Sequence, residues 1–544
     1  MTAFADLAAS FLAEEHAESP VTATHLGVDA YDDRLDDLSE AAFARRRRRA
    51  ADWLDRFAAV PDVGLGLEER IDRDLLLAVL RGRGIMADWE MWRRQPETYL
   101  GPGLSGVFAF FLHRLKPEAD LVRAAIARLG EVPGLLAAGR RNLAPDLAPR
   151  VYVERAIGQA RAGARYFREL LPAEVADPGL RSRLAEAGAR AAAAVDDFAR
   201  FLESFREAAV GPWAIGERRY SRLLRERELL PYDAAALRER GRREYDRLAG
   251  ELAVCARRVA GTDDWTRVLA ELNRDHPATP EAMREAYADW TERARRFLRE
   301  RGLVTLPEGE ECRVVPSPHF QRPVLAVASY MSPPPFSALM RGHFFVPFPP
   351  DGASADEIQK RLENNSFPGI PTTAVHEAYP GHHWHLVSMK GHPSAVRRTF
   401  RTAYFSEGWA LYAEQMMREQ GFFTDPRQEM CQYEATLFRA ARIVVDTSLH
   451  AGDMGFEEAV RFMMERANLP EPTARAEVGR YCAWPTQASA YLTGCLEILR
   501  VRERFLAARG DGGVGTLRAF HDTLARSGGL PIALAERALF GAPA

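Results

Sequence analysis

Apolar residues recur every three or four positions over most of the chain, which is the spacing of an amphipathic helix. In residues 279–302, Met283 and Trp290 belong to one such apolar stripe. Thr279 is placed to cap this helix, and Pro280 is suited to its first turn. The same periodicity predicts long helices over 117–139, 151–172, 178–208 and 233–260.

One stretch departs from the helical pattern. Residues 303–347 are rich in proline and in residues that favour β-structure. Short apolar runs at 313–316, 324–328 and 342–346 predict the strands of a small sheet. We therefore expect a mainly helical protein that folds as one cooperative unit. Its parts would be a helical N-terminal lobe (1–302), a small sheet segment (303–350) and a helical C-terminal lobe (351–544).

The composition is that of an ordinary globular protein, with 47% hydrophobic and 27% charged residues among 544. Lys and Arg number 73 against 76 Asp and Glu, which gives a formal charge of −3. Because a nucleic-acid-binding domain usually has a basic excess, we expect no nucleic-acid partner. No apolar run approaches the roughly 18 residues of a membrane span, so we expect no membrane partner.

Five consecutive arginines, Arg45–Arg49, stand in a predicted helix whose apolar face includes Phe43 and Trp53. Five consecutive residues point in all directions around a helix, so some of these side chains must lie along the edge of the core. We expect a solvated helix face, and a basic patch for an acidic ligand is the alternative.

The five cysteines are odd in number, and no two of them have Cys-x-x-Cys spacing. This pattern is typical neither of a disulfide framework nor of a thiolate zinc site. The first 20 residues carry acidic side chains where a signal peptide carries basic ones. We therefore expect a soluble protein in the reducing environment of the cytoplasm.

Four of the 13 histidines fall within the ten residues 376–385. Isolated histidines are usually structural, but a group this dense that includes a glutamate is more typical of a metal site. His376-Glu377 matches the start of the H-E-x-x-H motif, in which two histidines one helical turn apart bind zinc and the glutamate acts as general base. The group therefore predicts a metal site with hydrolytic chemistry.

The motif differs from this template at its fifth position, which is Pro380 instead of histidine. In a regular helix His382 would lie on another face than His376, and His383 would lie about 10.5 Å further along the axis, too far to share a zinc ion. Pro380 and Gly381 can interrupt a helix, because proline lacks the amide hydrogen and glycine tolerates unusual backbone angles. A two-residue bulge there would return His382 to the position of the second histidine, and His383 is the alternative ligand.

A catalytic zinc site needs a third protein ligand and an open position. Glu407 is the candidate, because it lies 25 positions after His382, enough for one helix, a turn and the start of the next. Glu414 shares its face two turns on and is the candidate partner of a ligand histidine. Two histidines and one carboxylate also describe a non-haem iron site, and a helical binding protein without catalysis is a further alternative. Glu377 favours the hydrolase, because an oxygenase needs no base beside its metal.

With these residues identified, the chain resembles the bacterial family called domain of unknown function 885, which is similar to zinc peptidases of the gluzincin type. The resemblance covers essentially the whole chain and rests on the segments 26–28, 31–35, 376–383, 406–412, 480–481, 485–488 and 491–494. It implies a two-lobed, mostly helical gluzincin-like fold with a long cleft and a small sheet beside the metal. It also implies one zinc ion held by His376, His382 and Glu407.

The resemblance further suggests how a substrate is held. By analogy with related peptidases, Tyr491 is expected to donate a hydrogen bond to the oxyanion of the tetrahedral intermediate, with Tyr481 as the alternative. Residues 328–330 could offer a strand edge to an extended peptide, and Arg480 or Arg500 could hold a substrate carboxylate. We therefore expect a peptide or an acyl-amide small molecule as substrate.

Overall fold

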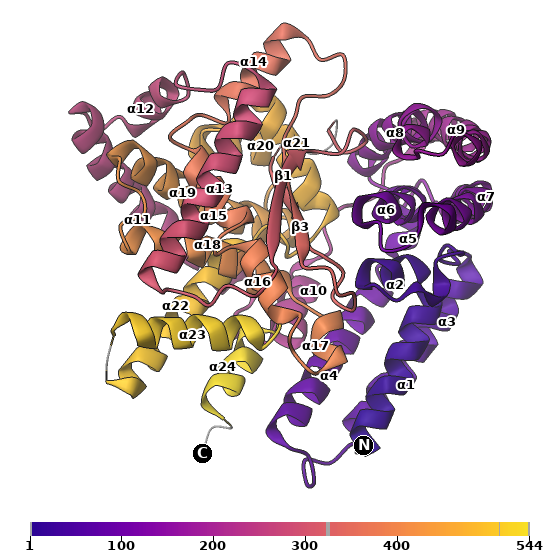
Figure 1. Ribbon diagram of the computed structural model, residues 1–544, viewed down its shortest axis with the longest axis horizontal. Coiled ribbons are helices and arrows are strands. Elements are labelled where there is room, and N and C mark those ends of the chain that lie inside the picture. The colour runs from indigo at the N-terminus through magenta and orange to yellow at the C-terminus, as the bar shows by residue number, and fades with distance from the viewer. Residues whose placement is uncertain (1–2, 323–326, 511, 542–544) are drawn as a thin grey trace.

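The computed structural model describes residues 3–322, 327–510 and 512–541. Within these ranges the protein is mainly helical with one small sheet, as predicted (Figure 1). The helices up to residue 222 are α1 (Ala3–Glu18), α2 (Pro20–Leu26), α3 (Glu40–Ala58), α4 (Leu67–Ala87), α5 (Met91–Arg94), α6 (Glu97–His113), α7 (Glu118–Asn142), α8 (Arg150–Arg165), α9 (Pro178–Phe205) and α10 (Glu217–Arg222).

The remaining helices carry the candidate functional residues. They are α11 (Ala234–Ala260), α12 (Trp265–Leu272), α13 (Pro280–Arg301), α14 (Ala355–Glu363), α15 (Ile370–Glu377), α16 (His382–Met389), α17 (Ala395–Thr399), α18 (Ala403–Glu419), α19 (Pro426–Ala451), α20 (Phe456–Ala467), α21 (Glu471–Ala483), α22 (Ala490–Arg509), α23 (Val514–Arg526) and α24 (Ile532–Phe540). Short turns of other helix types are η1 (Asp29–Tyr31), η2 (Tyr166–Leu170), η3 (Pro172–Glu174), η4 (Arg206–Ala208) and η5 (Leu223–Arg227).

The five helices predicted from apolar periodicity are confirmed as α7, α8, α9, α11 and α13, with ends that differ by a few residues. The capping prediction for α13 is also confirmed. The Thr279 side chain accepts a hydrogen bond from the Ala282 N–H, and Pro280 is the first helical residue. Gly302, with φ 63°, ends the helix in the left-handed conformation that suits glycine.

The sheet has three strands in the order β1-β3-β2. They are β1 (Glu311–Pro316), β2 (Ser329–Met331) and β3 (Arg341–Val346), with β3 parallel to β1 and antiparallel to β2. The strands predicted at 313–316 and 342–346 are therefore confirmed. Of the third predicted strand, 324–328, only Val327 and Ala328 lie within the described residues, and they directly precede β2.

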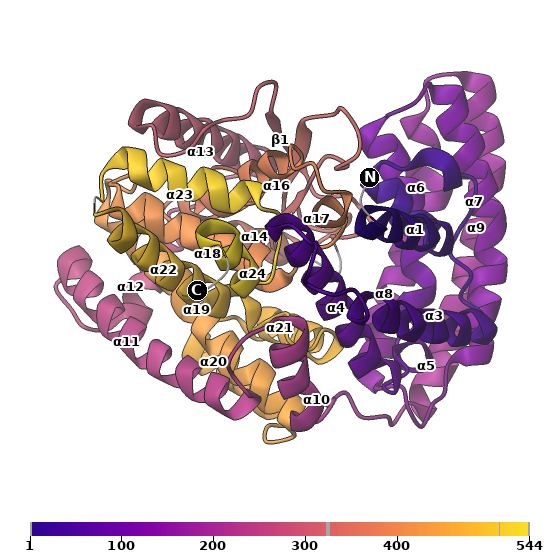
Figure 2. The ribbon, with the colours of Figure 1, turned by 90° about the horizontal axis from the view of Figure 1, so that it is seen from below.

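Two hydrophobic cores hold the helices together. Helices α6 to α9 share one core around Leu104, Val153 and Leu184, and form the layer at the right of Figures 1 and 2. The larger core includes Trp384 and Trp409 and joins α4, α11 and α13 to the helices from α15 onward. α11 packs along α19, and the sheet stands between the larger body and the α6–α9 layer (Figure 1). The division of the chain at residues 302 and 350 stays a prediction.

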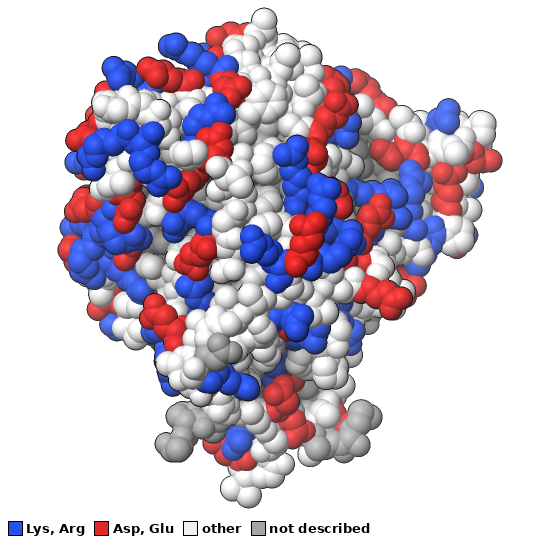
Figure 3. All heavy atoms as spheres, turned by 60° about the vertical axis from the view of Figure 1, so that its left-hand side comes forward, with Lys and Arg blue, Asp and Glu red and all other residues white. Residues whose placement is uncertain are grey.

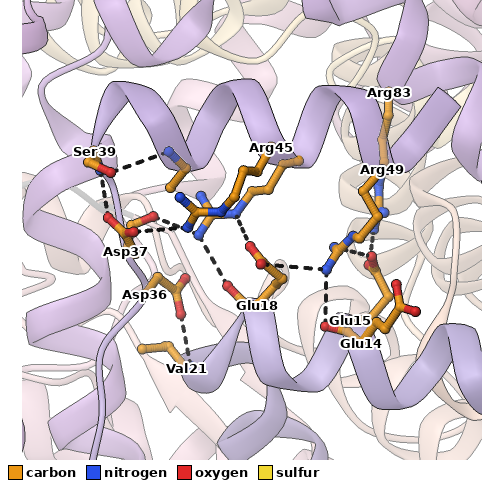
Figure 4. Close-up of polar contacts among 12 residues, drawn as sticks. Glu14, Glu15, Glu18, Val21, Asp36, Asp37, Ser39, Arg45, Arg49 and Arg83 are labelled. Carbon is orange, nitrogen blue, oxygen red and sulfur yellow. Dashed lines mark hydrogen bonds and ion pairs between the residues drawn. The ribbon is translucent and has the colours of Figure 1, made fainter. Parts of the chain in front are cut away.

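The arginine run Arg45–Arg49 lies on α3, which packs beside α1 (Figure 4). Arg45 pairs with Asp37, Arg46 with Glu18 and Arg49 with Glu15, so carboxylates of the same chain balance these charges. On the face in Figure 3, acidic and basic side chains are interspersed in the same way. The pairing accounts for the run without an acidic ligand. Among the described residues, no helix combines the length and the apolar character needed to cross a membrane.

Candidate metal centre

The segment that carries the four clustered histidines is a helix with one interruption. α15 ends at Glu377 and α16 begins at His382, and the Tyr379-Pro380 peptide bond between them is cis. The break therefore covers four residues, where the sequence predicted a bulge of two. Gly381 is required in it, because a Cβ atom at this position would lie 1.9 Å from the carbonyl oxygen of His376.

Hydrogen bonds from two directions hold the break in shape. The Gly381 N–H donates to the Val375 carbonyl (3.0 Å), and Trp409 Nε1 of α18 donates to the Pro380 carbonyl (2.8 Å). As a result, the rings of His382 and His376 meet edge to face, with centroids 4.9 Å apart. The interruption thus returns His382 to the side of His376, as the sequence predicted.

His376, His382 and Glu407 offer ligand atoms that all lie within 4.8 Å of one another. Glu407 Oε2 is 3.3 Å from His382 Nε2 and 3.7 Å from His376 Nε2. Ligands about 2.1 Å from a tetrahedral zinc ion are roughly 3.4 Å apart. The donor types and their spacing therefore fit a zinc ion with three protein ligands. This is the one such group of three among the described residues.

A buried carboxylate orients the first histidine. Glu414 Oε1, on a fully buried side chain, lies 2.7 Å from His376 Nδ1, so Glu414 is hydrogen-bonded to this histidine. Because the Nδ1–H donates to Glu414, Nε2 is left facing Glu407. Burial alone lowers the pKa of His376, but its hydrogen bonds to Glu407 and Glu414 raise that pKa to about 9. The surroundings thus favour positive charge at this point.

Glu377 is the last residue of α15 and is buried. Together with His376 and Tyr491 it lines a cavity of about 290 Å³. Burial raises the pKa of the Glu377 carboxyl group above its usual value, although His376 and His382 nearby oppose the rise. A carboxylate with a raised pKa binds a proton more readily, which suits a general base.

Tyr491 lies in the first turn of α22 and stacks on His376, with ring centroids 6.2 Å apart and planes inclined by 16°. Its hydroxyl accepts a hydrogen bond from Gln487 Nε2 (3.2 Å), and no described residue accepts its proton. The alternative, Tyr481, donates to Glu477 (2.7 Å) and is therefore occupied within the protein. The geometry favours Tyr491 as the donor beside the cluster.

Glu407 and Tyr491 reach one centre because α18 and α22 touch backbone to backbone. A Cβ atom at Gly408 would lie 2.5 Å from the carbonyl carbon of Gly494, and a Cβ atom at Gly494 would lie 1.8 Å from the carbonyl oxygen of Tyr404. Neither position has room for a side chain. The sequence motifs at 406–412 and 491–494 therefore meet in one packing contact.

His383, the alternative ligand, is engaged elsewhere. Its fully buried ring places Nε2 2.8 Å from Glu310 and Nδ1 2.8 Å from the Tyr330 hydroxyl. Glu310 also accepts hydrogen bonds from the Tyr379 hydroxyl and from Arg295 Nε. This network supports the helix break from the side opposite the cluster. Sequence reasoning missed Glu310, since an acidic residue just before a strand carries no distinctive signal.

The two arginines expected to hold a substrate carboxylate are both paired within the protein. Arg480 pairs with Glu477, and Arg500 pairs with Glu497. Neither lines the cavity beside the cluster, whereas Arg439 of α19 does. Nothing in the sequence distinguishes this residue from the other arginines, because pairing depends on the tertiary structure.

Comparisons with known proteins agree with the fold. The profile of the family described as "Bacterial protein of unknown function (DUF885)" matches residues 20–539, so the chain belongs to this family. The structure of a "putative lipoprotein of unknown function" from Shewanella oneidensis has a TM-score of 0.78 at 21% identity over 99% of both chains. A "putative lipoprotein" from Colwellia psychrerythraea has a TM-score of 0.84 at 20% identity over 98% of both chains. No curated protein matches the chain.

Proposed function

We propose that this member of the DUF885 family is a zinc-dependent hydrolase that cleaves a peptide or peptide-like amide bond and has a gluzincin-like, two-lobed form. One observation carries the proposal. His376, His382 and Glu407 bring three ligand atoms to the spacing of a zinc site, and the cavity beside them is lined by a buried glutamate. A non-haem iron enzyme would need the same three ligands but not this base. A bound zinc ion would activate a water molecule and polarise the amide carbonyl.

The chain's own groups supply the remaining steps. Glu377 accepts the proton of the attacking water and later delivers it to the leaving nitrogen. The Tyr491 hydroxyl donates a hydrogen bond to the carbonyl oxygen as negative charge develops on it. Glu414 holds the imidazole of His376 in one orientation through the Nδ1–H. Proton transfer, charge stabilisation and orientation are thus divided among three residues.

The edge of β2 supports a peptide-like substrate. β2 is one of the two edge strands of the sheet and pairs only with β3 among the described strands. Val327 and Ala328, which precede it, line the same cavity as His376 and Glu377. An extended peptide can add to such an edge by main-chain hydrogen bonds.

For location we keep the cytoplasm as our proposal. The five cysteines, all within the described residues, are free, which fits a reducing compartment. The two related structures are named "putative lipoprotein", a name that implies attachment to a membrane. Cell fractionation distinguishes a cytoplasmic protein from a membrane-attached one.

The substitution Glu377→Gln tests the proposal. The variant is expected to bind one zinc ion per chain, as the unaltered protein does, and to lose hydrolysis of every substrate found. Glu281→Gln, at an exposed position in the first turn of α13, is the matched control and is expected to keep full activity. Both are screened with zinc-loaded protein against a mixed library of peptides and acyl amides, with products identified by mass spectrometry. Hydrolysis retained by Glu377→Gln would refute the assigned base.

A further inference from the structure

The cavity beside the candidate zinc ligands contains two arginines with different surroundings. His376, Glu377 and Tyr491 line it on one side, and α19 contributes Arg439 and Arg442. Its volume of about 290 Å³ is at the small end of ligand sites, which begin at roughly 300 Å³. The cavity therefore suits a small group, such as one amino-acid residue.

Arg442 is fully committed to the protein. Its Nε donates to the Tyr481 hydroxyl (3.0 Å), and its Nη2 donates to Glu477 (2.7 Å). Arg439, one turn earlier, makes a single hydrogen bond, from Nη1 to the Ala435 carbonyl of its own helix (2.9 Å). Its Nε is buried and has no hydrogen-bond partner among the described residues. The guanidinium group of Arg439 therefore has N–H donors that are free to bind a ligand, whereas that of Arg442 is hydrogen-bonded within the protein through two of its nitrogens.

Among the described residues, the carboxylates that line the cavity accept no hydrogen bond from Arg439, and Glu414 forms only a long ion pair with it. Glu414 is hydrogen-bonded to His376, and its Oε1 lies 3.9 Å from Arg439 Nη2, beyond hydrogen-bond distance. Glu477 is paired with Arg442, and Glu434 accepts from Asn468. A planar guanidinium with free donors is the group that best matches a carboxylate, because two parallel hydrogen bonds can form.

The position of Arg439 relates it to the cluster. Its Nη2 is next to Glu414, which is bonded to Nδ1 of His376, while Nε2 of the same ring faces Glu407. Arg439 is thus linked to the His376 ring through Glu414, and its guanidinium carbon lies 5.8 Å from the ring centroid of Tyr491, which stacks on His376. Consecutive residues of a peptide are about 3.8 Å apart. A peptide cut at its last amide therefore carries its free carboxylate only one residue beyond the reacting carbonyl.

We propose that Arg439 binds the free carboxylate of the residue that follows the cleaved amide, an inference that rests on the proposed hydrolase function. The substrates are then dipeptides, short peptides or N-acyl amino acids, which are cut at the C-terminal amide. Water adds its oxygen to the carbonyl carbon, the C–N bond breaks, and the released amine takes the proton, so that a carboxylic acid and a free amino acid form. Phe438 and Leu469 in the cavity wall offer apolar contact to the side chain of that residue.

The first experiment compares substrates that differ only at the C-terminus. N-acyl dipeptides ending in a carboxylate are paired with the same compounds ending in a carboxamide. The unaltered enzyme is expected to prefer the acids by about tenfold to a hundredfold in kcat/KM, the range of a charge-assisted hydrogen bond. Arg439→Gln is expected to lose activity on the acids alone. Arg439→Lys keeps the positive charge but loses the two parallel donors of the guanidinium, so it should retain part of the preference for the acids. This variant replaces Arg439→Gln in the comparison if the glutamine variant folds poorly.

The second experiment measures binding without turnover. N-acetyl-L-leucine and N-acetyl-L-leucinamide are titrated by calorimetry into zinc-loaded Glu377→Gln protein, which is not expected to hydrolyse them. Adding Arg439→Gln to this background is expected to weaken binding of the acid at least tenfold and to leave binding of the amide unchanged. Arg427→Gln, at an exposed arginine near the start of the same helix, is the control and should change neither.

The two experiments separate the two proposals. If no compound is hydrolysed but the acid still depends on Arg439 for binding, the hydrolase proposal fails and the carboxylate site stands. If acid and amide behave alike, or if Arg439→Gln weakens both equally, the carboxylate site is refuted whether or not the enzyme cleaves amides.

Discussion

Replacing Glu414 by glutamine tests how strongly the chain orients the candidate zinc ligands. Glu414 is fully buried and accepts a hydrogen bond from His376 Nδ1 at 2.7 Å, and its second oxygen, Oε2, has no partner. The glutamine side chain has almost the same shape and can still accept from Nδ1. The substitution therefore removes the negative charge behind the ligand and changes little else.

The size of the effect follows from this geometry. Charge-assisted hydrogen bonds contribute about 1.5–3 kcal/mol and are about twice as strong as neutral ones. Losing half of that stabilisation corresponds to about 0.75–1.5 kcal/mol, or a zinc complex that is roughly four- to thirteenfold weaker at high pH. Glu414→Ala, which removes the bond altogether, should weaken zinc binding by about a hundredfold.

The pH of the assay matters, because protons compete with zinc for His376. Burial lowers the pKa of this histidine, but Glu407 and Glu414 raise it to about 9. At pH 7 the metal-free protein therefore holds a proton there that zinc must displace, so zinc affinity should rise between pH 7 and about 9. Glu414→Gln also lowers this pKa, so the variant should lose less affinity at pH 7 than at pH 9.

Zinc affinity is measured by competition with a chelating dye at both pH values. Glu419→Gln, further along α18 and paired with Arg502 away from the cluster, is the matched control. If Glu414→Gln and Glu419→Gln bind zinc equally well at pH 9, Glu414 does not support a ligand and the argument is wrong.

Two further substitutions test how the centre is built. In metal analysis after dialysis, His382→Ala should have lost zinc. His383→Ala should keep most of its zinc and mainly lower the melting temperature, because His383 is hydrogen-bonded to Glu310 and Tyr330. The reverse result would move the second ligand to His383. Gly494→Ala should cost about 3 kcal/mol of stability, because its Cβ atom would lie 1.8 Å from the Tyr404 carbonyl oxygen. The control Gly130→Ala in α7, where no described atom lies within 4 Å of the added Cβ, should be neutral or slightly stabilising. Equal melting temperatures for the two variants would show that α18 and α22 do not need this contact.

The sequence was most informative where a local pattern determines local structure. Thr279 and Pro280 mark the start of α13, and a three-to-four-residue apolar period marks its length. The same holds for the centre, since the pair Pro380-Gly381 was sufficient to predict that the helix breaks before His382. These features depend on backbone preferences and on spacing, which a single sequence displays directly.

Other features depend on which segments meet in space. Within the four-residue break, Trp409 of α18 donates a hydrogen bond to the Pro380 carbonyl, a contact that the sequence around the break does not show. Glu310 and Arg439 were missed for the same reason. Each is an ordinary charged residue in the sequence, and only the folded chain shows that Glu310 joins Tyr379 to His383, and that Arg439 has an unpaired Nε.

The three candidate ligands and several of the other residues that line the cavity come from different parts of the chain. His376, His382 and Glu407 come from α15, α16 and the start of α18, whereas Arg439 comes from α19 and Leu469 from the segment after α20. In evolutionary terms the two sets of residues can therefore change independently. Under the proposed hydrolase function, substitutions in α19 and after α20 would change the substrate while the three candidate ligands are preserved. On that proposal, a family with this arrangement would share one chemistry and still differ widely in what its members cleave.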